Sequence, residues 1–156
     1  AASDVYKRQE CVRCAGLLHD IGKVGVSDAI LCKDDKLTEE EFAVIRRHPE
    51  IGEKILSCID MFHNLGGIVR AHHERMDGGG YPDGLLGEQI PLEARMISIA
   101  DAFDAMMSDR HYRKRLSLSK AKEELAAGRG TQFDERLVDV FLGLIERGEL
   151  GELEET

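Results

Sequence analysis

The sequence lacks the features of a membrane-spanning or secreted protein. No apolar run approaches the roughly 20 residues that a membrane-spanning helix needs, and no secretion signal precedes the cysteines. Four cysteines in 156 residues are too few for a disulfide scaffold, so reduced thiols and a cytoplasmic location are expected. The formal net charge of −9 disfavours binding to a nucleic acid polymer, although it leaves room for a local basic pocket that binds a phosphate ligand.

Strand-like alternation is also missing, since no run of the chain sustains a period of two residues. Apolar residues recur at helical spacing instead, which predicts an all-α bundle of about seven helices. The length fits a single domain, which we place at residues 10–148. Residues 1–9 have no clear periodicity and no initiating Met, and are expected to be a foreign leader. Residues 149–156 form an acidic tail that should fray.

Helix boundaries follow from start and stop signals. Thr38 and Glu41 are spaced as a capping box, and Pro49 can end one helix and open the next. One long helix is apolar around nearly its whole circumference, so it should be the central helix of the bundle. The expected helices cover residues 10–20, 38–48, 49–59, 65–73, 91–108, 117–128 and 134–148.

The Cys11-x-x-Cys14 pair has two interpretations. It could be half of a zinc or redox site, but no second pair of this kind follows in the sequence. Both cysteines are in helical phase with Ala15 and Leu18. We therefore expect them to be small core residues.

The most informative stretch is His19-Asp20, which interrupts an otherwise apolar helical face. An unpartnered buried charge costs several kcal/mol, so these two side chains should pair with other groups or bind a metal. Asp101 and Asp104 pose the same question inside the apolar central helix. Asp101 is the better ligand candidate because its neighbours are both alanines. The alternative is a carboxylate paired with an arginine, such as Arg95 or Arg110.

Three more histidines fall at helix ends, where bundles often place metal ligands. The resulting candidate set holds imidazole and carboxylate groups only, and consists of His19, Asp20, His48, His72, His73 and Asp101. Adjacent residues on a helix point about 100° apart, so the two adjacent pairs suit two neighbouring ions or a ring of ligands. Because the set has no thiolate, it suits Fe, Mn or Zn and argues against a structural cysteine–zinc site.

Two further segments invite a functional interpretation. The loop at residues 77–82 contains three consecutive glycines, which permit positive φ angles or close approach of a ligand. A floppy surface turn is the alternative, but Tyr81-Pro82 stiffens the loop. Residues 109–115 form the only dense basic cluster of this acidic chain. They are either a solvated turn or a phosphate-binding segment, since arginine fits phosphate oxygens.

Taken in order along residues 10–142, these motifs resemble the HD-GYP family of cyclic dinucleotide phosphodiesterases, a branch of the HD phosphohydrolases. The matching segments are residues 19–23, 48–50, 72–75, 77–82, 90–91, 94–95, 99–101 and 108–110 with 112–113. The resemblance implies an HD-domain helical bundle that hydrolyses cyclic di-GMP to pGpG and on to GMP in bacterial signalling.

The resemblance also implies a site with two divalent ions, Fe or Mn, with Zn or Mg as alternatives. One ion would be held by His19, Asp20 and Asp101, and the other by His48, His72 and His73, with Asp20 bridging the two. We hypothesise that a bridging hydroxide attacks phosphorus. Asp20 and Lys23 are then the candidate catalytic residues, although Lys23 could instead pair with a surface acid. The residues expected to bind substrate are Lys23, Gly80, Tyr81, Pro82, Arg110 and Arg113.

Departures from the family leave alternatives open. The family has another His, and in some members a Glu, on a helix upstream of His19, so this chain would be truncated at its N-terminus and its first ion would lack a ligand. His111 and Glu135 stand where the family often has Pro, and His63 belongs to no matching motif. The alternatives are a binding module for a cyclic dinucleotide or a GGDEF domain, and a hydrolase of mononucleotides. An upstream regulatory domain is expected as well.

Overall fold

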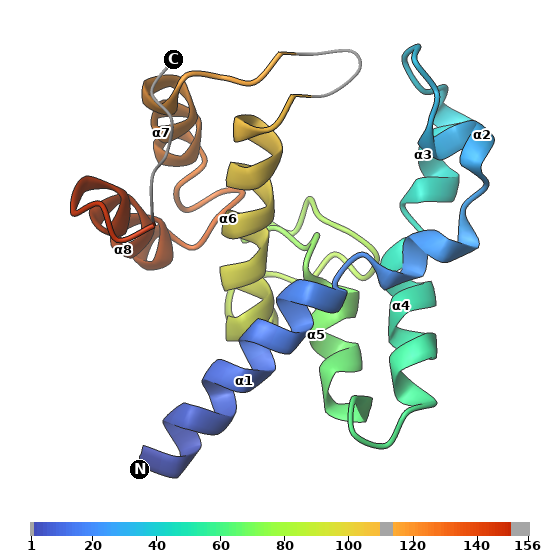
Figure 1. Cartoon of the computed structure of the whole chain (residues 1–156), viewed down its shortest axis with the longest axis horizontal. Coiled ribbons are helices and arrows are strands. Elements are labelled where there is room, and N and C mark those ends of the chain that lie inside the picture. The colour runs from blue at the N-terminus through green and yellow to red at the C-terminus, as the bar shows by residue number, and fades with distance from the viewer. Residues whose placement is uncertain (1, 110–113, 151–156) are drawn as a thin grey trace.

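The computed structural model describes residues 2–109 and 114–150, and within these ranges it is helical with two isolated β-bridges and no strand (Figure 1). The predicted all-α class is therefore confirmed. The helices are α1 (Ala2–Leu18), η1 (Ile21–Gly25), α2 (Asp28–Leu31), α3 (Glu39–Ile45), α4 (His48–Ser57), η2 (His63–Leu65), α5 (Gly66–Ala71), η3 (Gly87–Gln89), α6 (Leu92–Met107), α7 (Leu118–Ala127) and α8 (Glu135–Glu146). Over the same ranges, none of the helices has the length and apolar character needed to cross a membrane.

Helix α1 differs from the prediction at both ends. It begins at Ala2 rather than near residue 10 and ends at Leu18, so His19 and Asp20 lie in the turn between α1 and η1. Its cysteines pack against the hydrophobic core, which confirms their interpretation as core residues. Whether residues 1–9 are foreign to the domain stays a prediction.

The capping box at the start of α3 is confirmed. The backbone N–H of Glu41 donates to Oγ1 of Thr38 at 3.2 Å, and the N–H of Thr38 donates to Oε2 of Glu41 at 2.8 Å. Helix α3 ends at Ile45, earlier than predicted, and Pro49 lies in the first turn of α4. The two-residue connection leaves His48 buried at the junction, as the sequence predicted. The short helix α2 was not predicted.

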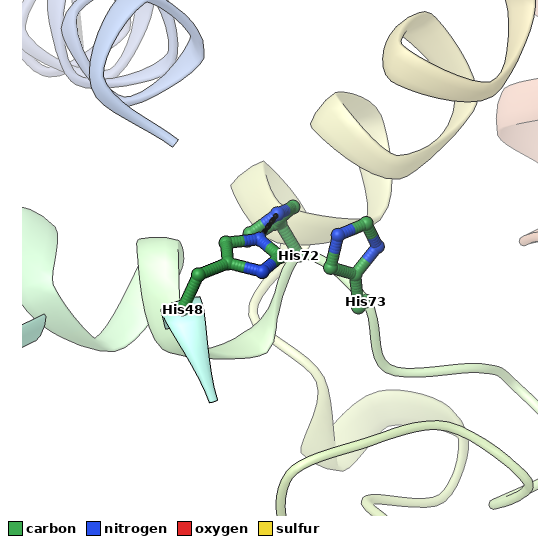
Figure 2. A group of neighbouring side chains, drawn as sticks. All are labelled: His48, His72 and His73. Atoms are coloured by element: carbon green, nitrogen blue, oxygen red, sulfur yellow. Dashed lines mark hydrogen bonds between the residues drawn. The ribbon is translucent and has the colours of Figure 1, made fainter. Parts of the chain in front are cut away.

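Helix α4 packs against both η1 and α5. The contact with η1 depends on Gly22, since a Cβ atom there would lie 1.9 Å from the carbonyl oxygen of His48 and 2.6 Å from the backbone nitrogen of Gly52. This close approach brings Asp20, which precedes η1, beside the start of α4. On the other side, α5 ends at Ala71, and the residue that follows it, His72, lies next to His48 (Figure 2).

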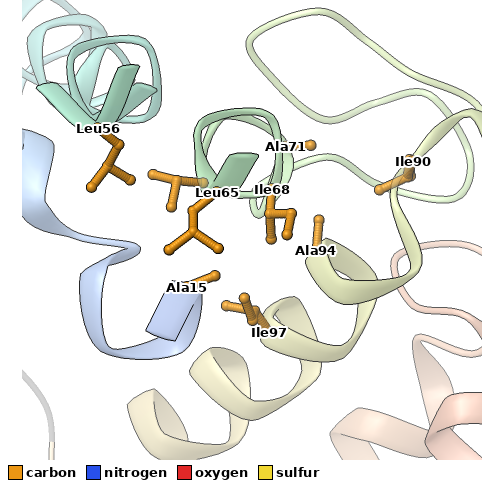
Figure 3. Packing of buried hydrophobic residues seen from close by; sticks show 9 residues of the cluster. Ala15, Leu56, Leu65, Ile68, Ala71, Ile90, Ala94 and Ile97 are labelled. Atoms are coloured by element: carbon orange, nitrogen blue, oxygen red, sulfur yellow. The ribbon is translucent and has the colours of Figure 1, made fainter. Parts of the chain in front are cut away.

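Helix α6 is central, as its apolar circumference predicted, because it contributes to two hydrophobic clusters. The first joins it to α1, α4 and α5 (Figure 3) and contains Ala15, Leu56, Leu65, Ile68, Val69, Ala71, Ile90, Ala94 and Ile97. The second joins it to α7 and α8 and contains Ile99, Phe103, Ala121, Leu125, Phe133, Val138 and Ile145. Along α6, the first cluster ends at Ile97 and the second begins at Ile99, and Asp101 lies between Ile99 and Phe103 of the second cluster.

Candidate metal centre

Three of the predicted histidines are anchored in the same way. In His19, His48 and His72, the ring atom Nδ1 lies within hydrogen-bond distance of the backbone carbonyl three residues earlier. These carbonyls belong to Gly16 at 2.6 Å, Ile45 at 2.7 Å and Val69 at 2.5 Å. Because a carbonyl oxygen can only accept, Nδ1 donates and carries the proton. In the neutral ring, Nε2 then presents a lone pair, which is the arrangement of metal-binding histidines.

The imidazole rings converge in the interior, from α4 and from the end of α5 (Figure 2). The Nε2 atoms of His48 and His72 are 3.3 Å apart, and both side chains are buried. The ring of His73 has its centroid 4.0 Å from that of His72 and 5.0 Å from that of His48. With the Nδ1 protons on the far sides of the rings, two lone pairs face each other at close range. A cation between them would remove this repulsion.

The two carboxylates complete the cluster. Oδ1 of Asp20 lies 3.3 Å from Nε2 of His48, and Oδ2 lies 3.5 Å from Nε2 of His19. Asp101 places Oδ1 at 3.6 Å from the same Nε2 of His19. The ammonium group of Lys23 donates to Oδ2 of Asp20 at 2.6 Å. Asp20 therefore lies between His19 and His48. It is also the acid that pairs with Lys23, so this lysine contacts the cluster.

Burial keeps the inner histidines neutral. It lowers the pKa of His72 to about 4, since a charged ring would lose its hydration. The pKa of His48 is lowered by burial too, although the Ile45 carbonyl and the Asp20 carboxylate oppose the shift. Burial and the neighbouring imidazoles lower the pKa of His73. Neutral rings are the form that binds metals.

In the outer part of the cluster, neighbouring groups favour the charged forms of His19, Asp20 and Asp101. Asp101 raises the pKa of His19, against the effect of burial. Burial favours the protonated form of Asp20, but Lys23, His19 and His48 outweigh it and lower the pKa. For Asp101, burial is likewise outweighed, here by His19 first, and the pKa is lowered. Both carboxylates are therefore ionised at neutral pH, and a positive charge close to Nε2 of His19 would stabilise them.

This donor set fits divalent cations. Within the described ranges, two groups have ligand atoms that all lie within 4.8 Å of one another, namely His48, His72 and His73, and His19, Asp20 and His72. The first group has the same members as the predicted second ion site. The other differs from the predicted first site, because it contains His72 and not Asp101. The structure thus brings the six predicted residues together, and their role as ligands stays a prediction.

Four other residues were considered from the sequence, namely Asp104, Arg95, Arg110 and Arg113. Asp104 is exposed, so the expectation that it is embedded in apolar surroundings is wrong. Arg95 donates to Asp134 at 2.7 Å and is not the partner that was considered for Asp101. Arg110 and Arg113 lie outside the described residues, and their phosphate-binding role stays a prediction.

The loop after the twin histidines packs against the centre. The ring of Tyr81 has its centroid 5.0 Å from that of His73, and the N–H of Tyr81 donates to the carbonyl of His73 at 3.3 Å. The close approach requires Gly80, since a Cβ atom there would lie 2.4 Å from the backbone nitrogen of Arg75 and 2.5 Å from Cα of Glu74. The alternative of a floppy surface turn is therefore wrong.

Sequence reasoning assigned no role to Glu74, which holds this loop. Its side chain is buried, and its two oxygens accept three backbone N–H groups. Oε1 accepts from Asp83 at 2.7 Å and Gly84 at 3.1 Å, and Oε2 accepts from Leu85 at 3.0 Å. The position of Glu74 directly after His72 and His73 could have suggested a role. Its hydrogen-bond partners could not be predicted, because they lie in a turn without helical periodicity.

A second anchor of the loop is Arg70 on α5. Its guanidinium group makes two hydrogen bonds to Asp83, at 2.7 and 2.8 Å, and a third to Glu53 on α4 at 2.8 Å. Such bidentate pairs fix orientation as well as distance. The loop is thereby tied to the two helices that carry the inner histidines.

This helical bundle with an inward-facing cluster of histidine and aspartate side chains is an HD domain: the chain belongs to the HD domain family, whose model matches residues 4–137. Among curated relatives, the cyclic di-GMP phosphodiesterase response regulator RpfG of Xanthomonas campestris is 47% identical over 133 residues, covering 84% of this chain and 35% of RpfG. The 3'3'-cGAMP-specific phosphodiesterase 3 of Vibrio cholerae is 46% identical over 110 residues, covering 70% of this chain and 24% of that protein.

A solved structure shows the same fold. The HDG"Y"P protein Bd1817 of Bdellovibrio bacteriovorus superimposes with a TM-score of 0.70 at 20% identity, covering 90% of this chain and 44% of that chain. The resemblance to HD-GYP proteins that the motifs indicated is therefore confirmed. The chain spans about a third of the length of RpfG.

Proposed function

We propose that this chain is the hydrolytic domain of a metal-dependent phosphodiesterase that cleaves cyclic di-GMP to pGpG and on to GMP. The observation that carries the proposal is the facing pair of Nε2 atoms in His48 and His72, 3.3 Å apart, with the ionised Asp20 beside them. The printed names of the relatives support the substrate class, since RpfG is named for cyclic di-GMP.

The ligands of the proposed centre are His19, Asp20, His48, His72, His73 and Asp101. Two bound divalent ions would supply Lewis acidity and an activated water for attack on phosphorus. The chain holds the donors in place beforehand: the Nδ1 bonds fix the rings of His19, His48 and His72. Fe or Mn is proposed as the metal on the strength of the family resemblance, and the nitrogen and oxygen donors suit both of these ions as well as Zn.

Lys23 has two roles in this proposal. Its ammonium group donates to Asp20 at 2.6 Å and so orients that carboxylate. The lysine side chain is 40% exposed, which leaves further N–H donors for a phosphate oxygen of the substrate. Arg110 and Arg113 are proposed to bind the remaining phosphate oxygens.

Tyr81 forms one wall of the proposed substrate site. Burial raises the pKa of its phenol to about 12, so the hydroxyl group stays protonated and can donate a hydrogen bond at neutral pH. Gly80 and Pro82 place this ring against His73, with Gly80 making the close approach. A GGDEF-domain partner and an upstream regulatory domain stay predictions of the family resemblance.

Metal analysis combined with turnover tests the proposal. We expect bound Fe or Mn after reconstitution and conversion of cyclic di-GMP to pGpG that stops when a chelator is added. Folded, metal-loaded protein that binds cyclic di-GMP without cleaving it would favour the binding module. Cleavage of mononucleotides alone would favour the other alternative, and either result contradicts the proposal.

A further inference from the structure

A pocket of about 350 Å³ adjoins the candidate metal centre. It shares His73 with the histidine cluster, so a ligand in the pocket lies next to the metal ligands. Its polar lining comes from segments that are far apart in the sequence, and includes Arg46, Arg75, Tyr81, Ser98 and Gln132. The volume falls in the range of small-molecule sites.

Arg46 gives this pocket an available guanidinium group. Over the described ranges, no carboxylate pairs with Arg46, whose guanidinium carbon lies 4.7 Å from the ring centroid of Phe42 and 5.2 Å from that of Tyr81. In contrast, Arg75 in the same pocket is bound to Asp77 through two hydrogen bonds, at 3.0 and 2.7 Å. As far as the described residues show, Arg46 therefore keeps its N–H donors available to a ligand.

An arginine beside an aromatic ring has the chemistry of a purine subsite. Arginine binds the O6 and N7 acceptors of guanine through two hydrogen bonds, whereas adenine presents an amino donor in place of O6. The hydroxyl of Ser98 and the amide of Gln132 add donors and acceptors to the same pocket.

We propose that this pocket is a guanine subsite, in which Arg46, held over the rings of Phe42 and Tyr81, recognises the O6 and N7 edge of the base. The base belongs to a nucleotide whose phosphate lies at the metal centre, so the inference rests on the proposed function and deepens it. Arg46 is then a specificity residue: it distinguishes cyclic dinucleotides that place guanine in this pocket from those that place adenine there.

Binding of GMP and AMP, measured by calorimetry, tests the subsite directly. We expect the unmodified chain to prefer GMP. Arg46→Ala should weaken GMP binding about 5- to 150-fold, the worth of one bidentate base contact, and leave AMP binding nearly unchanged. Arg46→Lys, which keeps the charge but loses the planar fork, should also lose the preference. Arg47→Ala is the matched control, because it removes the same charge from the adjacent exposed residue, which does not line the pocket.

Equal weakening of GMP and AMP by Arg46→Ala would show a phosphate contact and overturn the guanine assignment. An unchanged affinity for both nucleotides would overturn the subsite altogether. Turnover separates this inference from the proposed function, because cleavage of cyclic di-GMP with no effect of Arg46 on GMP binding refutes only the subsite. A GMP preference that depends on Arg46, in a metal-loaded chain that cleaves no cyclic dinucleotide, supports the subsite and refutes the proposed function.

Discussion

Nε2 of His48 and Nε2 of His72 lie 3.3 Å apart, while both rings donate from Nδ1 to a backbone carbonyl. Neither ring in its neutral form has a proton left to share across this gap. Buried acceptors without a donor cost free energy. We therefore expect this histidine pair to stabilise the fold only when a cation binds between the two Nε2 atoms. The geometry links metal binding to stability and leads to the first two predictions.

Addition of Mn²⁺ or Fe²⁺ to chelator-treated protein should raise its melting temperature. A ligand that binds only the folded state stabilises it by about 2.7 kcal/mol at a concentration of 100 times Kd. The measurement is thermal unfolding with and without metal. His48→Ala should abolish the increase, whereas His63→Ala, at an exposed histidine outside the cluster, should retain it. An equal increase in both variants would place the metal elsewhere.

Asp20→Asn should remove metal and activity together. The substitution keeps the shape of the side chain but deletes the charge that lies 3.3 Å from His48 and 2.6 Å from Lys23. We expect turnover of cyclic di-GMP to fall by at least about 100-fold, with metal content measured on the same sample. Asp104→Asn, at an exposed carboxylate of α6, is the control and should behave like the unmodified chain. Full turnover by folded, metal-free Asp20→Asn protein is incompatible with the proposed chemistry.

Gly22→Ala should destabilise the domain. The new Cβ atom would lie 1.9 Å from the carbonyl oxygen of His48, so η1 must move away from α4. Overpacking typically costs about 1–3 kcal/mol, and a clash with backbone should reach the upper end of that range. Urea denaturation measures the loss. Gly67→Ala on α5 has no atom within 4 Å of its Cβ position and should be neutral or slightly stabilising. Similar values for both variants would contradict the packing argument.

Glu74→Gln should loosen the Tyr81 loop without removing the metal. Glutamine has one acceptor oxygen, so its NH₂ group would face a backbone N–H that Glu74 now accepts. An unsatisfied buried donor costs about 1–3 kcal/mol. Hydrogen exchange should become faster at Asp83, Gly84 and Leu85, and KM for cyclic di-GMP should rise more than kcat falls. Glu88→Gln at an exposed position is the control. Loss of bound metal, or unchanged exchange at these amides, would contradict a positioning role.

Much of this architecture was accessible from local sequence signals. The capping box at Thr38 and the N-caps Ser117 and Asp134 act within a few residues of the chain, so the starts of α3, α7 and α8 were predicted closely. The ligand candidates were also recognisable, because polar groups such as His19 and Asp101 stand out on apolar helical faces.

The missed features depend on contacts between distant segments. Arg46 has an ordinary sequence context, and only the fold brings it to Tyr81. Asp104 occurs in the same apolar run as Asp101, yet the rotation of α6 leaves it exposed, which sequence spacing alone did not resolve. The start of α1 was missed because residues 1–9 have no clear apolar periodicity.

Helix α6 joins the two hydrophobic clusters, and it carries Asp101 just beyond the point where the first cluster gives way to the second. We expect a substitution that changes the side-chain volume of Phe103 in the second cluster, or of Ile97 in the first, to shift α6. Such a shift would change the 3.6 Å distance between Oδ1 of Asp101 and Nε2 of His19. Repacking either half should tune the centre without altering any of its donor atoms.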